Sequence, residues 1–399
     1  MRRLWVGYYF RRETVICDAL TIEDPTTEPD FDVVIIGAGA AGLYALHRVR
    51  GLGLSAKVYE KGEGVGGTWF WNRYPGARCD VESWDYCYTF SEELELEWEW
   101  TERFPTQPEL ERYFNHVADR FDLRRDIEFE TRVDQARFDD DQNRWLIKTS
   151  TGATVSARFL ISAAGCLSEV NTPRFEGVDT FKGQQIHTAR WPKGGIDVTG
   201  KRVGVIGTGS TGVQVIPQLA KQAEHLLVFQ RTPQFAIPAR NRPLDDETLE
   251  ELKHNYRERW EFKRSSSTGM GRRPAGGSSA LEVDGATRTR AFEASWERGG
   301  TGFARTFNDV MTNAESNQIT SQFVKDKIRD KVAEPAVAES LVAIDYPLGA
   351  RRLIVEIDYF ETYNRPNVTL VDVAANPITE ITPQGLRTTE GAYDLDLIV

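Results

Sequence analysis

Two stretches of the chain share one order of hydrophobic and polar positions. In the first stretch, the β-branched run Val33–Ile36 predicts a buried parallel strand, and the residues from Ala41 to about Gly51 have the periodicity of a helix. The next predicted strand is Ala56–Glu60. Glycines occupy the turn between the first strand and the helix. This order predicts a βαβ unit, in which the two strands belong to one parallel sheet.

The second stretch repeats this order further along the chain. It predicts a strand at Arg202–Ile206, a helix from Thr211 to about Gln222 and a strand at His225–Phe229, again with glycines in the first turn. Between the two stretches, residues 107–123 have the pattern of an amphipathic helix. Residues 143–165 predict a hairpin that turns near Thr151 and continues into a strand.

The remaining segments have different patterns. Residues 64–83, rich in Gly, Trp and Arg, lack clear periodicity and predict an ordered loop. From Leu244 to about Val342 the pattern is mostly helical, and a Gly/Ser/Arg-rich stretch at 264–280 predicts a mobile loop within it. Residues 367–399 are strand-like again, and the chain ends within an apolar run.

Together these patterns predict an α/β fold with two Rossmann-like dinucleotide-binding domains and a helical insertion in the second one. We expect a poorly defined extension at 1–29, the first domain at 30–165, the second at 166–240 and 348–399, and the insertion at 241–347.

Composition narrows the possible functions. The chain has 399 residues and a formal net charge of −11, which gives no reason to expect nucleic acid or an anionic membrane as a partner. No apolar run approaches the roughly 20 residues of a membrane helix. The four cysteines are scattered without CxxC spacing, which disfavours a dithiol redox centre and a metal cluster, and their scarcity fits a cytoplasmic protein.

The first glycine-rich turn has the spacing of a dinucleotide-binding fingerprint. Gly37, Gly39 and Gly42 follow a predicted strand and open a predicted helix, and Glu60 ends the next strand. Glycines at these positions let the backbone approach a pyrophosphate, whose charge the helix N-terminus stabilises. Glu60 stands near the position where an acid binds the ribose of such a cofactor. A tight turn beside a surface Glu is the structural alternative.

The second glycine-rich turn predicts a different nucleotide. Its residues are Gly207, Thr208, Gly209, Ser210, Thr211 and Gly212. No acid ends the following strand, where Arg231 and Thr232 stand instead. An Arg there suits the 2′-phosphate of NADP. One acid-tipped and one arginine-tipped site together predict FAD and NADPH, and so a flavoprotein that takes hydride from a nicotinamide. Disulfide, quinone and dioxygen remain open as acceptors, and the lack of CxxC disfavours the first.

The segment between the two turns carries a family resemblance. Phe181, Gly183, His187 and Trp191, followed by Pro192, have the spacing FxGxxxHxxxWP. This pattern resembles the fingerprint of type I Baeyer–Villiger monooxygenases. From about Asp32 to Val399 the chain is most similar to the phenylacetone and cyclohexanone monooxygenase branch of that family. Trp191 favours this group over N-hydroxylating and flavin-containing monooxygenases, which usually have Tyr or Phe there. The alternative for His187 is a structural role, and within the family it is a linker that couples domain motion.

The resemblance implies roles for further residues. It places five residues at the FAD site: Gly67, Thr68, Trp69, Asp80 and Tyr86. It makes Arg352 the active-site arginine, with Asp80 as its partner, and puts Arg351 where a Lys often binds the 2′-phosphate.

The implied activity is insertion of one oxygen atom of O2 next to a ketone carbonyl through a flavin C4a-peroxide, giving an ester or lactone. The implied enzyme is a monomer that also oxidises thioethers. Two alternatives remain open: a flavin monooxygenase that oxidises nitrogen or sulfur, and an inactive nucleotide-binding fragment. Family members continue past Val399 with the rest of the FAD domain. We therefore expect this chain to be C-terminally incomplete, to bind FAD poorly and to turn over slowly.

Overall fold

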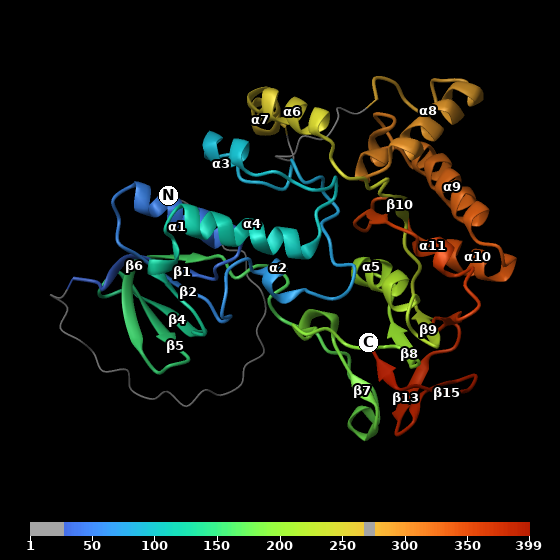
Figure 1. The fold of residues 1–399 in the computed structure, drawn as a ribbon, viewed down its shortest axis with the longest axis horizontal. Coiled ribbons are helices and arrows are strands. Elements are labelled where there is room, and N and C mark those ends of the chain that lie inside the picture. The colour runs from blue at the N-terminus through green and yellow to red at the C-terminus, as the bar shows by residue number, and fades with distance from the viewer. Residues whose placement is uncertain (1–27, 267–275) are drawn as a thin grey trace.

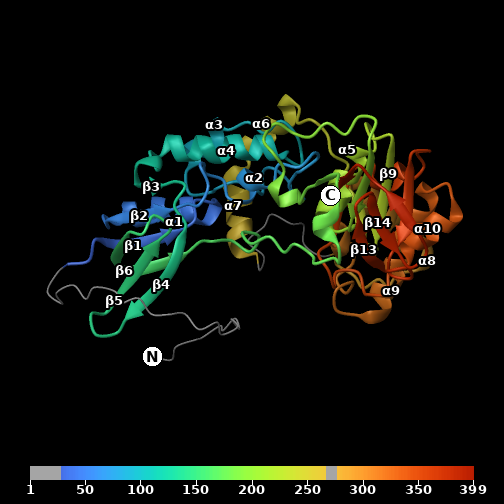
Figure 2. The ribbon, with the colours of Figure 1, turned by 90° about the horizontal axis from the view of Figure 1, so that it is seen from below.

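A computed structural model describes residues 28–266 and 276–399. Most of the extension expected at 1–29 and the middle part, 267–275, of the loop expected at 264–280 therefore lie outside the described residues. The chain forms two lobes, each built around a mainly parallel sheet, which lie side by side (Figures 1 and 2). In the described ranges, no helix has the length and apolar character that crossing a membrane requires.

The first lobe is built on a six-stranded sheet in the order β3-β2-β1-β6-β5-β4. Its strands are β1 Phe31–Ile36, β2 Ala56–Tyr59, β3 Ile127–Glu128, β4 Val133–Asp139, β5 Arg144–Thr149 and β6 Thr154–Ser162. The four strands β3, β2, β1 and β6 run parallel, and β5 and β4 continue the sheet antiparallel. The predicted hairpin is thus confirmed as the β5–β6 pair.

Helices α1 (Ala40–Gly51) and α4 (Gln107–Arg120) cover one face of this sheet. Leu43 and Leu46 of α1 pack with Leu110 and Val117 of α4 against Ile35. The helical spacing of these apolar residues forms the buried stripe that the sequence predicts. The loop at 64–83 differs from the prediction in one respect, because it contains the short helix α2 (Thr68–Trp71), whose four residues are too few to show a period in the sequence.

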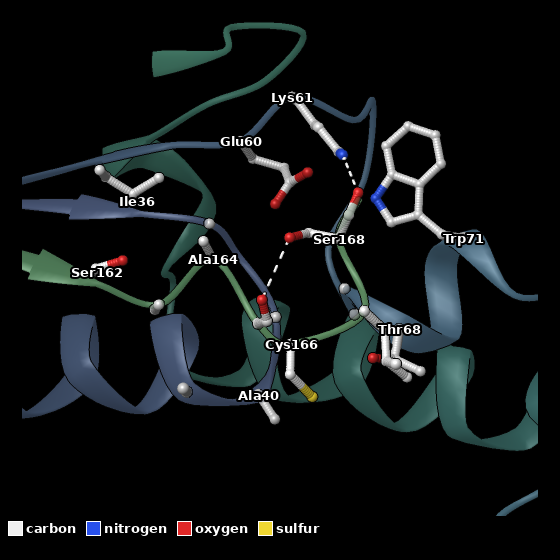
Figure 3. A pocket seen from close by; sticks show the side chains of 18 of the residues that line it. Ile36, Ala40, Glu60, Lys61, Thr68, Trp71, Ser162, Ala164, Cys166 and Ser168 are labelled. Carbon is white, nitrogen blue, oxygen red and sulfur yellow. Dashed lines mark hydrogen bonds between the residues drawn. The ribbon is translucent and has the colours of Figure 1, made fainter. Parts of the chain in front are cut away.

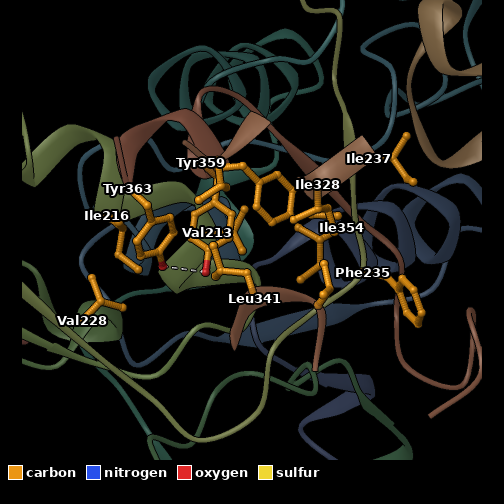
Figure 4. Packing of buried hydrophobic residues seen from close by; sticks show 14 of the residues in the cluster. Val213, Ile216, Val228, Phe235, Ile237, Ile328, Leu341, Ile354, Tyr359 and Tyr363 are labelled. Carbon is orange, nitrogen blue, oxygen red and sulfur yellow. Dashed lines mark hydrogen bonds between the residues drawn. The ribbon is translucent and has the colours of Figure 1, made fainter. Parts of the chain in front are cut away.

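The second lobe is built on a five-stranded parallel sheet in the order β12-β9-β8-β16-β7. Its strands are β7 Gln184–Gln185, β8 Arg202–Ile206, β9 His225–Gln230, β12 Val368–Asp372 and β16 Leu397–Ile398. Helix α5 (Ser210–Leu219) packs on one face through Val213 and Ile216, which lie close to Tyr359 and Tyr363 (Figure 4). The apolar run at the end of the chain is a buried strand, β16, between β8 and β7.

Smaller elements complete the second lobe. Strands β13 (Ile378–Thr382), β14 (Gly385–Thr388) and β15 (Ala392–Asp394) form an antiparallel sheet, which packs against the other face through Ile381 and Leu386. Strands β10 (Ala236–Pro238) and β11 (Ile354–Glu356) pair in parallel, and α11 (Tyr359–Thr362) is a short helix of this lobe. The short helix α3 (Glu92–Glu97) belongs to the first lobe. The predicted α/β fold with two Rossmann-like units is confirmed.

The predicted helical segment divides between the lobes. Helices α8 (Gly285–Arg298), α9 (Ala314–Lys331) and α10 (Pro335–Val342) join the core of the second lobe. Helices α6 (Asp246–His254) and α7 (Tyr256–Ser265) instead lie near α3 of the first lobe (Figure 1). There Lys263 and Asp85 form an ion pair at 3.2 Å, and their side chains are only 7% and 5% exposed. The chain therefore leaves the second lobe, contributes two helices to the first and returns.

Candidate functional site

A cavity of about 550 Å³ opens at the carboxyl ends of β1, β2 and β6 (Figure 3). In parallel sheets, this edge is where ligands bind. The wall includes Gly37, Gly39 and Glu60 of the first fingerprint, Gly67, Thr68 and Trp69 of the loop at 64–83, and Tyr86, which follows that loop. The end of β6 and the segment that follows it add residues 162–169, among them the exposed Cys166.

Each glycine of the first turn is required for a different physical reason. Gly37 has φ +96°, a left-handed conformation that favours glycine. A side chain on Gly42 would overlap the carbonyl oxygen of Gly37, so the helix can pass this close to the turn only with glycine there. Gly39 caps α1 without a side-chain hydrogen bond. The first amides of α1 thus face the cavity mouth as an anion site.

Glu60 follows β2 and is buried at the edge of the cavity. One carboxylate oxygen accepts a hydrogen bond from the backbone N–H of Ala38 at 2.7 Å, and the other accepts from Gly62 at 2.8 Å. Each oxygen keeps a second lone pair. The carboxylate is therefore held rigidly beside the glycine turn and can still accept hydrogen bonds from a ligand's hydroxyl groups.

Aromatic side chains form the far wall of the cavity. The indole N–H of Trp69 donates to the Tyr86 hydroxyl at 2.9 Å, and burial raises the pKa of Tyr86. Elsewhere in the wall, Lys61 donates to the carbonyl oxygen of Ser168 at 2.7 Å and lies 5.4 Å from the ring centre of Trp71 (Figure 3). These walls suit a large, flat, mostly apolar ligand.

Arg352 and Asp80 form a two-pronged ion pair between residues 272 positions apart. Arg352 Nε donates to Asp80 Oδ2 at 2.8 Å, and a second guanidinium nitrogen donates to Oδ1. Asp80 is buried, whereas much of the Arg352 side chain is exposed. Burial alone would lower the pKa of Arg352, but the Asp80 carboxylate raises it, so the guanidinium stays charged. Asp80 is absent from the wall of the described cavity, and its contact with a cofactor remains a prediction.

The second glycine turn repeats the construction of the first. Gly207 has φ +106°, and a side chain on Gly212 would overlap the Gly207 carbonyl oxygen. Gly209 caps α5 without a side-chain hydrogen bond, and Ser210 begins the helix, so this N-terminus also offers free amides. The hydroxyl of Thr208 donates to the carbonyl oxygen of Thr232 at 3.1 Å. The glycine turn is thereby joined to the turn that follows β9.

Two arginines flank this second turn. Arg231 is exposed directly after β9. The guanidinium of Arg351 lies 4.6 Å from the ring centre of Tyr346, and the Tyr346 hydroxyl donates to the carbonyl oxygen of Pro233 at 2.9 Å. Tyr346 thus holds the loop bearing Arg351 against the loop bearing Arg231 and Thr232. Two positive charges lie at the same end of the sheet, as a phosphate would need.

The FxGxxxHxxxW segment joins two hydrophobic cores. Phe181 packs with the β13–β15 sheet, and Trp191 packs with the α5 side of the second lobe. A side chain on Gly183 would meet the Phe181 ring and the carbonyl oxygen of Asp396. His187 accepts a hydrogen bond at Nδ1 from the backbone N–H of Ala189 at 3.1 Å. Its pKa is lowered mainly by burial and to a smaller extent by the positive charge of nearby Arg190. His187 is therefore a neutral group within the connecting segment.

Known proteins share this arrangement. A Baeyer–Villiger monooxygenase of Pseudooceanicola batsensis is 46% identical over 383 residues, which are 94% of this chain and 69% of that protein. The chain belongs to the Baeyer–Villiger monooxygenase family. Its residues 34–268 also match the family described as pyridine nucleotide-disulphide oxidoreductase. The resemblance seen in the sequence is thus confirmed.

Other relatives of this Baeyer–Villiger family member differ in their named reactions. A phenazine N-monooxygenase of Lysobacter antibioticus is 44% identical over 92% of this chain and 68% of that protein. The structure of an oxidized steroid monooxygenase bound to NADP is 54% identical, with a TM-score of 0.90, over 92% of this chain and 70% of that one. An open crystal structure of cyclohexanone monooxygenase is 42% identical, with a TM-score of 0.89, over 92% and 72%.

Sequence reasoning missed several residues of the candidate site in this Baeyer–Villiger family member. Lys61 and Trp71 complete the cavity wall, and Tyr346 holds the loop of Arg351. Gln214 of α5 contacts the loop before Asp80. Trp71 is close in sequence to Thr68 and Trp69, which the family resemblance places at the FAD site, so that resemblance could have suggested it. The other three act through contacts between distant segments, which leave no local signal.

Proposed function

We propose that this chain is an FAD- and NADPH-dependent monooxygenase that converts a ketone into an ester or lactone. The observation that carries the proposal is the pair between Arg352 and buried Asp80 in a protein with two glycine-rich nucleotide turns. Ketone, O2, NADPH and a proton give the ester, NADP⁺ and water. One oxygen atom enters between the carbonyl carbon and its neighbour, and the other leaves as water with the two electrons of NADPH.

FAD fits the first turn by the construction of its walls. Gly37, Gly39 and Gly42 leave the backbone bare for a pyrophosphate, and Glu60 can accept hydrogen bonds from the ribose. Gly67, Thr68, Trp69 and Tyr86 line the part of the cavity that would hold the ring system. Bound FAD supplies the redox and oxygen-activating chemistry that protein side chains lack.

NADP fits the second turn. The residues from Gly207 to Gly212 present the α5 N-terminus to the pyrophosphate, and Thr232 adds the neighbouring backbone. Arg231 and Arg351 supply positive charge for the 2′-phosphate. An Arg at position 351, where a Lys is frequent, keeps the charge and adds the ability to bind phosphate through two parallel hydrogen bonds.

Arg352 has the charge that ketone oxidation needs. When the carbonyl carbon is attacked, negative charge develops on the carbonyl oxygen, and a fixed guanidinium stabilises it. Asp80 orients that guanidinium through both of its carboxylate oxygens. His187 is uncharged at neutral pH because burial and then Arg190 lower its pKa, so it is a poor proton donor, and a linker rather than an acid–base role is proposed for it.

The choice of substrate distinguishes the main proposal from its alternative, oxidation of nitrogen or sulfur. The named reactions of the relatives include both N-oxidation and the oxidation of cyclohexanone, so family membership alone does not choose between them. The proposed partners are a ketone and O2, and thioether oxidation is a side activity. We also propose a monomeric, cytoplasmic enzyme, in line with the scarcity of cysteines.

The test is product analysis with labelled oxygen. Purified protein with FAD and NADPH is incubated under ¹⁸O2 with a cyclic ketone, a thioether or a phenazine, each in a separate reaction. We expect a lactone that carries one ¹⁸O atom, formed in proportion to the NADPH consumed. An N-oxide or sulfoxide without lactone would favour the alternative, and no oxygenated product from any of the three would contradict both.

Replacing Arg351 by Ala is expected to raise the KM for NADPH about tenfold or more, since a charged hydrogen bond to phosphate contributes about 1.5–3 kcal/mol. The KM for NADH, which has no 2′-phosphate, is expected to change less than about twofold. Initial-rate kinetics with both nucleotides measure this difference. Equal losses with NADPH and NADH would show that Arg351 does not read the 2′-phosphate. Arg231→Ala is expected to behave in the same way.

A further inference from the structure

The two lobes meet at a glutamine side chain. Gln214 lies on α5 of the second lobe, and its Oε1 accepts a hydrogen bond from the Tyr74 hydroxyl at 2.8 Å. Its Nε2 donates to the carbonyl oxygen of Arg78 at 3.0 Å, and the backbone N–H of Arg78 points back to Oε1 at 3.4 Å. Tyr74 and Arg78 belong to the loop of the first lobe. One amide side chain therefore holds this loop at two points.

The loop and the helix are in backbone contact at the same place. Gly76 has φ +82°, and a side chain there would lie 2.5 Å from the carbonyl oxygen of Gln214 and 2.9 Å from Cγ of Gln218. Such distances are shorter than real Cβ contacts. The loop at Gly76 thus lies directly against α5. Because the two backbones are in contact, a movement of α5 is expected to move this part of the loop with it.

Each end of this contact leads to a proposed functional group. On the helix side, Gln214 stands about one turn after Ser210, where α5 begins at the second glycine turn. On the loop side, Arg78 is two residues before Asp80, which holds the guanidinium of Arg352. Between them, the backbone N–H of Cys79 donates to the carbonyl oxygen of Pro105 at 3.0 Å, which limits the freedom of the loop.

We propose that Gln214 is a positioning residue that couples the nucleotide bound at α5 to the placement of Asp80 and Arg352. The inference rests on the proposed function, because it assigns the nucleotide to α5 and the charge to Arg352. A nucleotide that orders the first turn of α5 fixes Gln214, and Gln214 fixes the backbone of Arg78. By linkage, a well-placed loop in turn favours nucleotide binding.

Hydrogen–deuterium exchange of the purified protein tests the coupling directly. In the parent protein, NADP⁺ is expected to slow exchange both at residues 207–212 and at residues 74–80, the latter about fivefold or more, because stabilising a contact reduces local opening. In Gln214→Met, which keeps the volume of the side chain and removes its hydrogen bonds, protection at 207–212 is expected to remain. Protection at 74–80 is expected to be lost.

Gln218→Met is the matched control. Gln218 lies one turn further along α5 and also approaches Gly76, but its amide oxygen accepts a hydrogen bond from surface Lys221. This variant is expected to keep the response of the parent protein. Tyr74→Phe, which removes one of the bonds to Gln214, is expected to give an intermediate response. Loss of the response in Gln218→Met as well would overturn the proposal, since the effect would then follow from any change on the helix.

Two further results decide the matter. If NADP⁺ protects residues 207–212 but leaves exchange at 74–80 unchanged in the parent protein, or if Gln214→Met keeps the parent response, the coupling does not exist. In turnover, Gln214→Met is expected to lower the ratio of ester formed to NADPH consumed about threefold or more, with KM for NADPH within about twofold. A raised KM with an unchanged ratio would make Gln214 a nucleotide-binding residue and overturn the positioning role. The exchange measurement needs no product, so it separates this proposal from a failure of the proposed function.

Discussion

Replacing Arg352 by Met is expected to lower the kcat for ketone oxygenation by about 10²- to 10³-fold. This is the loss usually seen when one preorganised group that stabilises developing charge is removed. The reason is local: the guanidinium is held on both oxygens of buried Asp80 and keeps its charge. Reduction of the flavin by NADPH involves no ketone, so it does not require the charge of Arg352 to stabilise the substrate. We therefore expect its rate, measured without oxygen, to stay within about threefold of the parent protein.

Two further variants distinguish a loss of catalysis from a loss of folding stability. Arg352→Met leaves the buried Asp80 carboxylate without its counter-ion, which costs about 3–5 kcal/mol when a pair is fully buried and less here because Arg352 is exposed. The double variant Arg352→Met/Asp80→Asn removes the unpaired charge and is expected to recover thermal stability without recovering oxygenation. Arg352→Lys keeps a charge but loses the two-pronged geometry, and intermediate activity is expected. Normal oxygenation in Arg352→Met would refute the role.

Replacing Gly42 by Ala has the second-largest expected effect, loss of bound flavin. The new side chain would overlap the carbonyl oxygen of Gly37, so the turn must open or α1 must move. Changes of this kind belong to the exceptional substitutions that cost more than about 4 kcal/mol. We expect the dissociation constant for added FAD, measured by titration of the flavin fluorescence, to rise about tenfold or more relative to the parent protein under the same conditions.

The matched control lies on the same helix. Gly51 ends α1 and has nothing within 4 Å of its added side chain, so Gly51→Ala is expected to keep the flavin and to change stability by less than about 1 kcal/mol. Gly212→Ala makes the equivalent overlap with Gly207 in the second turn, and it is expected to abolish NADPH-dependent reduction while the flavin stays bound. If Gly42→Ala and Gly51→Ala retain flavin equally, the close packing of helix on turn is unimportant for binding.

The sequence predicted those features whose cause is local. The two βαβ units follow from the period of apolar residues and from glycines at fixed offsets, because the turn itself requires them. The FxGxxxHxxxW spacing located the connecting segment. Asp80 and Arg352 were paired in advance only through the family resemblance, since nothing within either segment indicates a partner 272 residues away.

The features that were not predicted depend on contacts between distant parts of the chain. Gln214 looks like any polar residue of a surface helix, and its role depends on its contact with Arg78, which lies 136 residues earlier in the chain. The same holds for α6 and α7, which have an ordinary amphipathic pattern and pack on the first lobe through Lys263 and Asp85. Periodicity tells which face of a helix is buried but not which neighbour buries it.

The position of α7 also has a consequence for synthesis on the ribosome. Asp85 emerges 178 residues before Lys263, and at about 5–20 residues per second the interval between them is on the order of ten to forty seconds. During that time the Asp85 carboxylate, which is buried in the folded protein, has no Lys263 ammonium to pair with. The nascent lobe therefore remains unfinished until the chain has passed through much of the second, which ties the maturation of the two lobes together in time.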